Sequence, residues 1–249
     1  GNRANFGLAT VGASPFSTTT VANDTLTVSG ITLVPESPGL GKGIRLIDST
    51  RAFIAPDISN NILTGQQETP MLLSSIIGGR IHDNNIGNWI ASGYKVAAGI
   101  ELGGCSGLLV DLNQVHDGVS SQTIDSAGIF TDGGCDGVTV RSNTITNIQG
   151  GSDDNSGQGT ALYFARNCIF ELNTLINCHR GTWAGGVAGD NNIIRNNSYS
   201  GCDIGIKINC SPTAGAFNYS VNNTFSNNIV DINSCPDGGI IDNIAPTVP

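Results

Sequence analysis

Charged and aromatic residues are both scarce in this 249-residue chain. Charged residues make up 12% of the sequence and aromatic residues 6%, and eleven Lys and Arg face twenty Asp and Glu. Nucleic acids and anionic membranes both require a basic surface, so the net charge of -9 argues against either as a partner. No apolar run approaches the ~20 residues that cross a bilayer, so no membrane insertion is predicted.

Helix-forming composition is also lacking, and turn and strand residues take its place. Gly accounts for 34 residues and Asn for 27. The composition is not that of a disordered chain, because 39% of the residues are hydrophobic and the charge is spread along the sequence. Gly and Asn favour turns while Ile, Val and Thr favour strands, which predicts an all-β protein.

Cysteine is present, but in no pattern typical of a metal site or a disulfide framework. The chain has seven Cys and no Cys-x-x-Cys pair. This density is too low for a small secreted scaffold held together by disulfides. No Ser-His-Asp arrangement, phosphate-binding loop or cluster of metal ligands is evident either. We therefore expect neither a metal nor a cofactor.

One short string recurs along the chain: an Asn, any residue, and then a large apolar residue. It begins at Asn60, Asn84, Asn113, Asn143, Asn173, Asn197 and Asn223. The steps between these positions are 24, 29, 30, 30, 24 and 26 residues, and a further 30 back from Asn60 reaches Gly30. Repetition at this period predicts about eight turns of one structural unit.

Each unit contains three short alternating segments separated by turns. A Gly-Ile pair opens the first, as at Gly43, Gly99, Gly128 and Gly205. The residues 138–142 are typical of the second segment and 144–147 of the third. Such a unit cannot bury its apolar face alone, but stacked copies can. The pattern therefore predicts a solenoid of three parallel sheets around a narrow core.

The combined pattern Gly-Ile-x-Leu, Cys, Val-x-Val, Asn-x-Ile-x-Asn resembles the repeat of pectate-lyase-like proteins, and most of all that of phage tailspikes. The resemblance implies an all-β, single-stranded right-handed parallel β-helix of about eight coils over residues 25–249. Residues 1–24 would be an N-terminal connector or cap. The likeness to tailspikes also implies a homotrimer and an extracellular or virion-surface location.

The Cys and Asn repeats are interpreted as structural. Two series of thiols are expected to stack inside the solenoid as free, buried side chains: Cys105, Cys135, Cys168 and Cys210, and Cys178, Cys202 and Cys235. Stacked Asn side chains in a turn satisfy buried backbone groups and tolerate the left-handed conformation.

Four consecutive units carry extra residues between the third segment and the next Gly-Ile pair. The predicted insertions are 87–98, 117–127, 150–159 and 180–186. Insertions on a solenoid map to one face and often carry function, so we expect them to form one wall of a groove. Trp89 belongs to this wall. The outward side chains expected at its foot are Glu101, Phe130, Asp132, Tyr163 and Arg166.

A groove with carboxylates and flat rings suits a polysaccharide. The candidate catalytic residues are Asp132, Glu101 and Asp125, because glycoside hydrolysis needs two carboxyl groups roughly 5 to 9.5 Å apart. The candidate substrate-binding residues are Trp183, Tyr163, Arg180, His179, Asp153, Asp154 and Arg166. Asp132 ranks first, Trp183 and Tyr163 are expected to be stacking platforms, and Arg180 is expected to contact an anionic sugar.

Three functions remain open on the sequence. The first is a tailspike-like depolymerase that binds and hydrolyses a bacterial surface polysaccharide. The second is a polysaccharide lyase or epimerase of the same fold, with a base among His179, Arg180, Tyr163 and Arg166. The third is a non-catalytic adhesive or structural β-helix.

Overall fold

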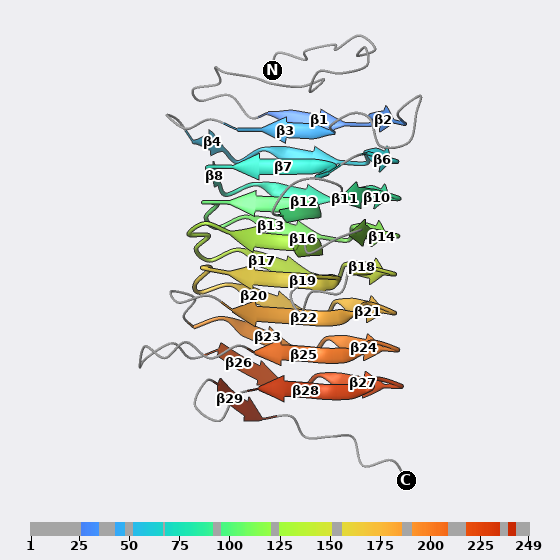
Figure 1. Ribbon diagram of the computed structural model, residues 1–249. Coiled ribbons are helices and arrows are strands. Elements are labelled where there is room, and N and C mark those ends of the chain that lie inside the picture. The colour runs from blue at the N-terminus through green and yellow to red at the C-terminus, as the bar shows by residue number, and fades with distance from the viewer. Residues whose placement is uncertain are drawn as a thin grey trace.

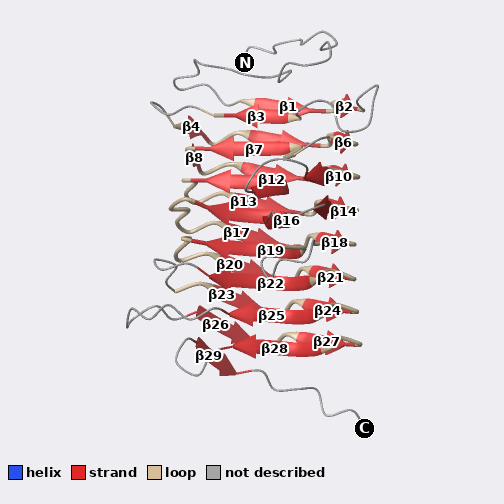
Figure 2. Ribbon diagram, viewed as in Figure 1, coloured by secondary structure: helices blue, strands red, loops and turns tan. Residues whose placement is uncertain are grey.

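Parallel strands stack along one axis from the N-terminal to the C-terminal part of the chain (Figure 1). The computed structural model describes residues 26–34, 43–47, 52–66, 68–91, 96–120, 125–150, 156–185, 191–208, 218–234 and 239–242. Within these residues every regular element is a strand (Figure 2). The fold is a right-handed parallel β-helix of about eight coils, as predicted. Residues 1–24, the predicted connector or cap, lie outside the described residues.

Three long sheets form the sides of the β-helix. Sheet A, at the front of Figure 1, contains β3 (Ile44–Leu46), β7 (Met71–Ser74), β12 (Val96–Gly103), β16 (Asp125–Asp132), β19 (Gln158–Tyr163), β22 (Arg180–Gly185), β25 (Ile204–Ile208) and β28 (Val230–Ser234). Sheet B contains β1 (Thr27–Ser29), β5 (Asp57–Ser59), β9 (Arg80–His82), β13 (Leu109–Asp111), β17 (Thr139–Arg141), β20 (Ile169–Glu171), β23 (Ile193–Arg195), β26 (Asn218–Val221) and β29 (Gly239–Asp242).

Sheet C completes the cross-section, and two small sheets lie at the corners. Sheet C contains β2 (Thr32–Leu33), β6 (Ile62–Thr64), β10 (Asn85–Gly87), β14 (Gln114–His116), β18 (Thr144–Thr146), β21 (Thr174–Ile176), β24 (Ser198–Ser200) and β27 (Thr224–Ser226). The small sheets pair β4 (Phe53–Ile54) with β8 (Ile76–Ile77), and β11 (Ile90–Ala91) with β15 (Val119–Ser120).

The Gly-Ile pairs have a clear packing role in sheet A. Ile100, Ile129 and Ile206 are fully buried in the core. The preceding glycines form a column in which the backbone of one coil lies directly against the next. A Cβ atom on Gly128 would lie 2.5 Å from the carbonyl oxygen of Gly159. Only glycine allows this approach between coils.

In two coils Thr takes the place of the Ile in this pair. Without the Gly-Ile pair, the sequence pattern did not predict the strand β22 (Arg180–Gly185). Thr160 and Thr182 are buried, and their hydroxyl groups lie 2.8 Å apart. The Thr182 hydroxyl also lies 2.8 Å from the hydroxyl of Tyr199, so the polar groups satisfy one another inside the core. The predicted insertion at 180–186 is therefore wrong, because Arg180–Gly185 is the sheet A strand β22.

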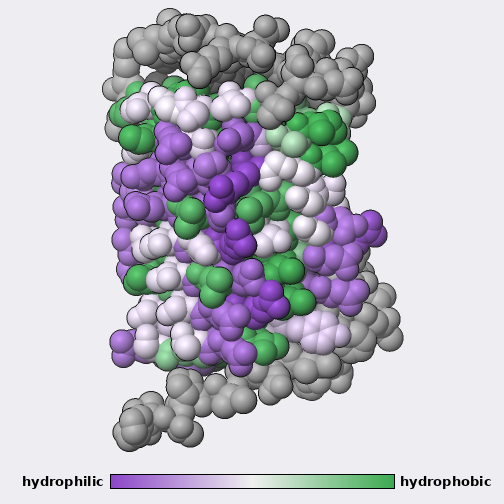
Figure 3. All heavy atoms as spheres, turned by 180° about the vertical axis from the view of Figure 1, so that it is seen from behind, coloured by the Kyte–Doolittle hydropathy of each residue, from purple (hydrophilic) through white to green (hydrophobic). Residues whose placement is uncertain are grey.

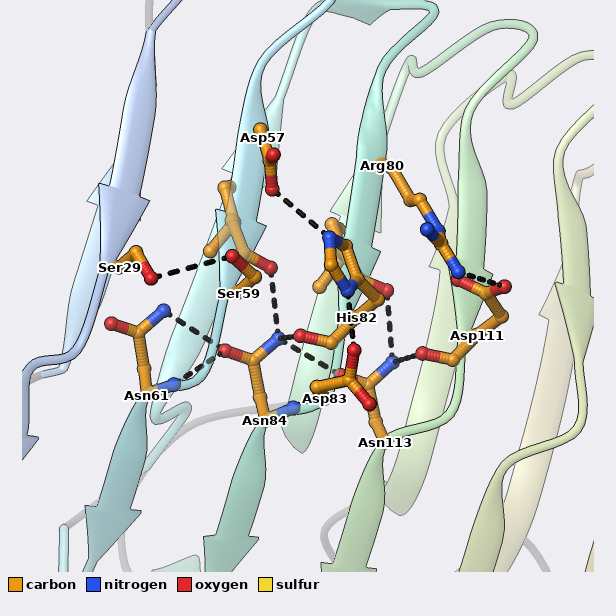
Figure 4. Close-up of polar contacts among 12 residues, drawn as sticks. Ser29, Asp57, Ser59, Asn61, Arg80, His82, Asp83, Asn84, Asp111 and Asn113 are labelled. Carbon is orange, nitrogen blue, oxygen red and sulfur yellow. Dashed lines mark hydrogen bonds and ion pairs between the residues drawn. The ribbon is translucent and has the colours of Figure 1, made fainter.

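A continuous ladder of buried Asn side chains lies at the corner between sheets B and C (Figure 4). Its members are Asn61, Asn84, Asn113, Asn143, Asn173, Asn197 and Asn223. The Asn113 amide donates to the carbonyl oxygens of Ile81 and Asp111 and to Asn143 Oδ1. In the first coil the ladder residue is Asn61, and the predicted Asn60 is wrong by one position.

The cysteine columns are shorter than predicted. All five described cysteines are free and buried. Cys105 and Cys135 stack on each other, and the Cys105 N–H donates to Cys135 Sγ. Cys168 instead aligns with Val138, because Ile169 pairs with Thr139, and Ala165 aligns with the other two thiols. Cys178 and Cys202 form a second pair, whereas Cys210 and Cys235 lie outside the described residues.

The outer face of sheet B is charged, and hydrophilic side chains form a band along the axis on the face seen in Figure 3. Arg80 donates to both carboxylate oxygens of Asp111, at 2.7 and 2.8 Å. Arg195 also pairs with Glu171, and its Nε and Nη2 lie 2.8 and 2.7 Å from the same oxygen, Oε2. His82 lies between Asp57 and Asp83, with ring nitrogens 3.1 and 2.6 Å from their oxygens (Figure 4).

Candidate active site

Two carboxyl groups share the outer face of sheet A. Glu101 lies on β12 between the buried residues Ile100 and Leu102, and Asp132 ends β16. The Cα partner of Asp132 is Gly103, two residues beyond Glu101. Strand spacing of ~4.8 Å and a rise of ~3.3 Å per residue place the two Cα atoms roughly 8 Å apart. The predicted pair is therefore brought together on adjacent coils.

Glu101 is held in a partly desolvated position. The buried hydroxyl of Thr69, from the preceding coil, donates to Glu101 Oε2 at 2.9 Å. Burial raises the pKa of the Glu101 carboxyl, and the negative charge of Asp132 raises it further. The hydrogen bond from Thr69 and the positive charge of Arg45 oppose this rise. The net effect favours the protonated acid.

Asp132 has a different local arrangement and a shift in the same direction. Burial raises the pKa of its carboxyl, while the Gly133 N–H, which donates to Oδ1 at 2.6 Å, lowers it. A carboxyl group whose protonated form is favoured by burial can act as a proton donor, and two such groups lie close together here. Neither carboxyl forms an ion pair with another described residue.

A row of aromatic rings continues the site along the axis. The Tyr163 ring stacks against Trp183 at 5.5 Å between centroids and lies 6.4 Å from the ring of Phe130. Phe130 and Trp183 are 2% and 5% exposed, so the expectation that both face solvent is wrong. Tyr163 is half-buried. It is the ring of this row that a ligand can reach, and the two buried rings hold it in place.

Trp89 does not belong to the site. Its side chain is fully buried in the core of the β-helix. A Cβ atom on Gly118, in the next coil, would overlap the indole ring. The missing side chain at Gly118 therefore makes room for the ring, and the prediction of Trp89 in a groove wall is wrong.

Three candidate residues lie at the opposite end of the sheet A strands. Asp125 begins β16 and is seven residues from Asp132, or roughly 20 Å along an extended strand. Arg180 begins β22 and is 2% exposed, so the expected contact with an anionic sugar does not agree with its burial. His179 precedes it, and its Nδ1 lies 2.8 Å from Asp203 Oδ2. These residues do not share a site with Asp132.

The remaining candidates have mixed outcomes. Arg166 is exposed on the turn that follows sheet A, and its Nε donates to Asp136 Oδ2 at 3.0 Å. Asp153 and Asp154 lie outside the described residues. Of the three remaining predicted insertions, 87–98 and 117–127 contribute the paired strands β11 and β15.

Two residues of the site were missed from the sequence. Thr69 comes from the preceding coil, and no local pattern connects it to Glu101. Phe164 follows Tyr163 directly and meets its ring edge-on, with centroids 4.2 Å apart and an angle of 74°. The sequence did contain a signal for Phe164. The equivalent position in the coil of β12 is Gly104, so a bulky residue replaces a turn glycine here.

Comparison with known proteins identifies the family. Residues 17–240 match the family described as periplasmic copper-binding protein (NosD). The chain belongs to the NosD family. No curated protein matches the sequence significantly. Among solved structures, an alginate lyase from Paenibacillus sp. str. FPU-7 aligns over 88% of this chain and 98% of its own, at 11% identity and a TM-score of 0.26. A likeness this weak says nothing about the reaction.

The described residues do not fit a copper site. No three His, Cys, Asp or Glu side chains among them are grouped as metal ligands. His82, His116 and His179 lie in different coils, and each bonds a carboxylate. The described thiols are buried inside the coil, and burial raises the pKa of Cys168 to about 12. A copper site needs several thiolate or imidazole ligands that converge on one ion, and the described residues hold no such group.

Proposed function

We propose that this NosD-family β-helix binds a polysaccharide along the outer face of sheet A and hydrolyses it there. The observation that carries the proposal is the pair Glu101 and Asp132, which are two carboxyl groups with raised pKa values on adjacent coils. Hydrolysis of a glycosidic bond requires such a pair.

We assign the two roles from what raises each pKa: burial and a neighbouring negative charge act on Glu101, and burial alone acts on Asp132. Glu101 is the general acid, because burial and the charge of Asp132 both favour its protonated form. Asp132 is the base that activates water. Both side chains leave the same face of sheet A on adjacent coils. Their carboxyl groups can therefore reach the ~6.5–9.5 Å separation by which inverting enzymes leave room for that water.

The neighbouring ring supplies a binding surface. Tyr163 stands beside Asp132 in the next coil, between the buried rings of Phe130 and Trp183. A rigid, half-exposed ring next to a carboxyl pair suits the apolar face of a sugar. Trp183 acts in this proposal as a support for Tyr163 and not as the platform itself.

A lyase or epimerase reaction has less support at this face. Elimination requires a base near the sugar ring and neutralisation of the uronate charge. His179 lies at the other end of the sheet, and Arg180 is buried. Tyr163 and Arg166 are the candidates for such a base that stay near Asp132, and Arg166 is already paired with Asp136.

Location and assembly complete the proposal. The description of the family as periplasmic supports a place outside the cytoplasm. None of the described residues forms a helix that could span a membrane. We also propose a homotrimer and a virion-surface location. Light scattering of the purified chain tests the trimer, and immunogold labelling of virions tests the location.

The decisive experiment measures the release of reducing ends from a panel of polysaccharides. Wild type should cleave at least one polymer, while Glu101→Gln and Asp132→Asn should bind the same polymer without cleaving it. Glu171→Gln, on the outer face of sheet B, is the matched control and should cleave as wild type does. Product that absorbs in the ultraviolet as an unsaturated uronate would establish a lyase instead. Binding without cleavage by wild type would establish a non-catalytic role.

A further inference from the structure

Phe164 has a backbone conformation that is unfavourable for a bulky residue. Its φ is +53°, in the left-handed region, at the turn from sheet A to sheet B. The same turn in adjacent coils holds Gly104, with φ +59°, and Gly133, with φ +57°. Glycine adopts this conformation freely, whereas a side chain with a Cβ crowds the carbonyl oxygen. The position therefore costs folding free energy that a glycine would avoid.

The Phe164 side chain stands at the end of an open surface. Gly103, Gly104, Gly133 and Gly134 form the turn in the two preceding coils. A Cβ atom on Gly134 would meet no atom within 4 Å, and the nearest atom to one on Gly104 would be 3.6 Å away. These glycines leave a surface without side chains next to Asp132, which we call the glycine floor. The half-buried rings of Tyr163 and Phe164 lie beside it in the next coil.

We propose that Phe164 forms the outer wall of a sugar subsite adjacent to the reacting bond. A pyranose ring would lie over the glycine floor with its apolar C–H face against Phe164, which places the neighbouring glycosidic bond beside Asp132. This subsite rests on the proposed function and names Phe164 as a positioning residue. Strained positions that persist beside a reactive group are frequently retained for such a purpose.

A corner on the far side of the molecule offers a matched control. Leu172 has φ +57° and is 55% exposed, at the turn between sheets B and C. It has a similar φ to Phe164, and it lies at a different corner of the coil from Glu101 and Asp132. Replacement of either residue by glycine should relieve strain, but only the change at position 164 should affect a ligand.

The test compares Phe164→Gly, Phe164→Tyr and Leu172→Gly with wild type. Two uronate polymers, alginate and polygalacturonate, and two neutral polymers, dextran and mannan, serve as probes, with affinity measured by calorimetry in the Asp132→Asn background. Both glycine variants should unfold at the same or higher urea concentration than wild type. Phe164→Gly should bind at least tenfold more weakly in this background, and with Asp132 intact it should raise KM more than it lowers kcat. Phe164→Tyr and Leu172→Gly should bind within about twofold of wild type.

The outcomes separate the subsite from the function. If wild type binds a probe and Phe164→Gly binds it equally well, the subsite is overturned while the function stands. The subsite is likewise overturned if Phe164→Tyr fails to restore binding, or if Phe164→Gly unfolds at clearly lower urea, since the ring then serves packing. If wild type binds none of the probes, the proposed function falls and the subsite falls with it.

Discussion

The outer faces of sheets A and B treat carboxyl groups in opposite ways. On sheet B, Asp111 is 2% exposed and accepts hydrogen bonds from Nε and Nη2 of Arg80. Arg141 lies 3.7 Å from the same carboxylate, and Glu171 is paired with Arg195. On sheet A, Glu101 and Asp132 have neutral donors, the Thr69 hydroxyl and the Gly133 N–H.

The contrast distinguishes structural charges from reactive ones. Sheet B alternates acidic and basic residues from one coil to the next along the axis, so each buried charge has a partner of opposite sign. Carboxyls that lack a cation and lose water shift toward the protonated form, and such groups cluster at functional sites. Position on a face is therefore a better guide to role than residue type.

The largest expected effect is on turnover. Asp132→Asn and Glu101→Gln should each lower kcat by a factor of roughly a hundred or more, because each removes a proton donor or acceptor from the reaction. Circular dichroism should show an unchanged fold. The comparison between the two faces breaks down if Glu171→Gln lowers kcat to the same extent.

The next effect concerns the core that both faces share. Ile129→Ala should lower the free energy of unfolding by about 2 to 5 kcal/mol, because it leaves a cavity directly behind Phe130. Thr139→Ala, on the outer side of sheet B, should cost less than about 0.5 kcal/mol. Urea melts of the two variants measure the difference. Equal losses would show that the assignment of inward and outward positions is wrong.

A smaller effect is expected from the ion pairs of sheet B. Asp111→Asn should lower the free energy of unfolding by about 1 to 3 kcal/mol, because the side chain is buried and loses charge-assisted hydrogen bonds from Arg80. Asp136→Asn, at the exposed pair with Arg166, should produce no measurable change. If Asp136→Asn proved as costly as Asp111→Asn, burial would not be what gives the sheet B pairs their strength.

The smallest effect is on how stability depends on pH. Its sign at Glu101 and Asp132 is opposite to its sign at Asp117. The folded pKa values of Glu101 and Asp132 are raised, so their contribution to stability is full below the unfolded pKa and is lost as pH rises through the folded pKa. The pKa of Asp117 is lowered by hydrogen bonds from His116 and Asn147. Its contribution is therefore present at neutral pH and is lost as pH falls.

Urea melts between about pH 2 and pH 8 can separate these contributions, because the loss at Asp117 falls below its unfolded pKa. The double variant Glu101→Gln, Asp132→Asn should lose less stability than wild type as pH rises over this range. Asp117→Asn should lose less stability than wild type as pH falls. A pH profile of the double variant identical to that of wild type would contradict the raised pKa values.

The repeat predicted the fold because its signals are local. The Asn string, the Gly-Ile pair and the alternating segments each specify a turn or a strand within one coil, and repetition requires the coils to stack. Glu101 and Asp132 were also predictable, since alternation places both on the outer face of a sheet A strand. The sequence did not show that Asp125 lies far from Asp132, because that distance depends on both residues belonging to one long strand, β16.

Register between coils was decided by the tertiary structure. The pattern within one coil leaves its alignment with the next coil open by a few residues. Asn61 therefore takes the place predicted for Asn60, and Cys168 aligns with Val138 instead of Cys135. Burial on the outside of the helix was also beyond the sequence pattern. Phe130 and Trp183 alternate as exposed residues would, yet both are buried in a cluster against which Tyr163 packs.

The sequence by itself determined that this chain is a parallel β-helix and that Glu101 and Asp132 face outward from sheet A. Period and alternation are properties of each coil and its immediate neighbours, and they need no knowledge of distant contacts. The tertiary structure alone decided which outward carboxyls form no ion pair with a described residue and which ring stays accessible. Those outcomes depend on desolvation and on partners such as Thr69, which is 32 residues away from Glu101 along the chain.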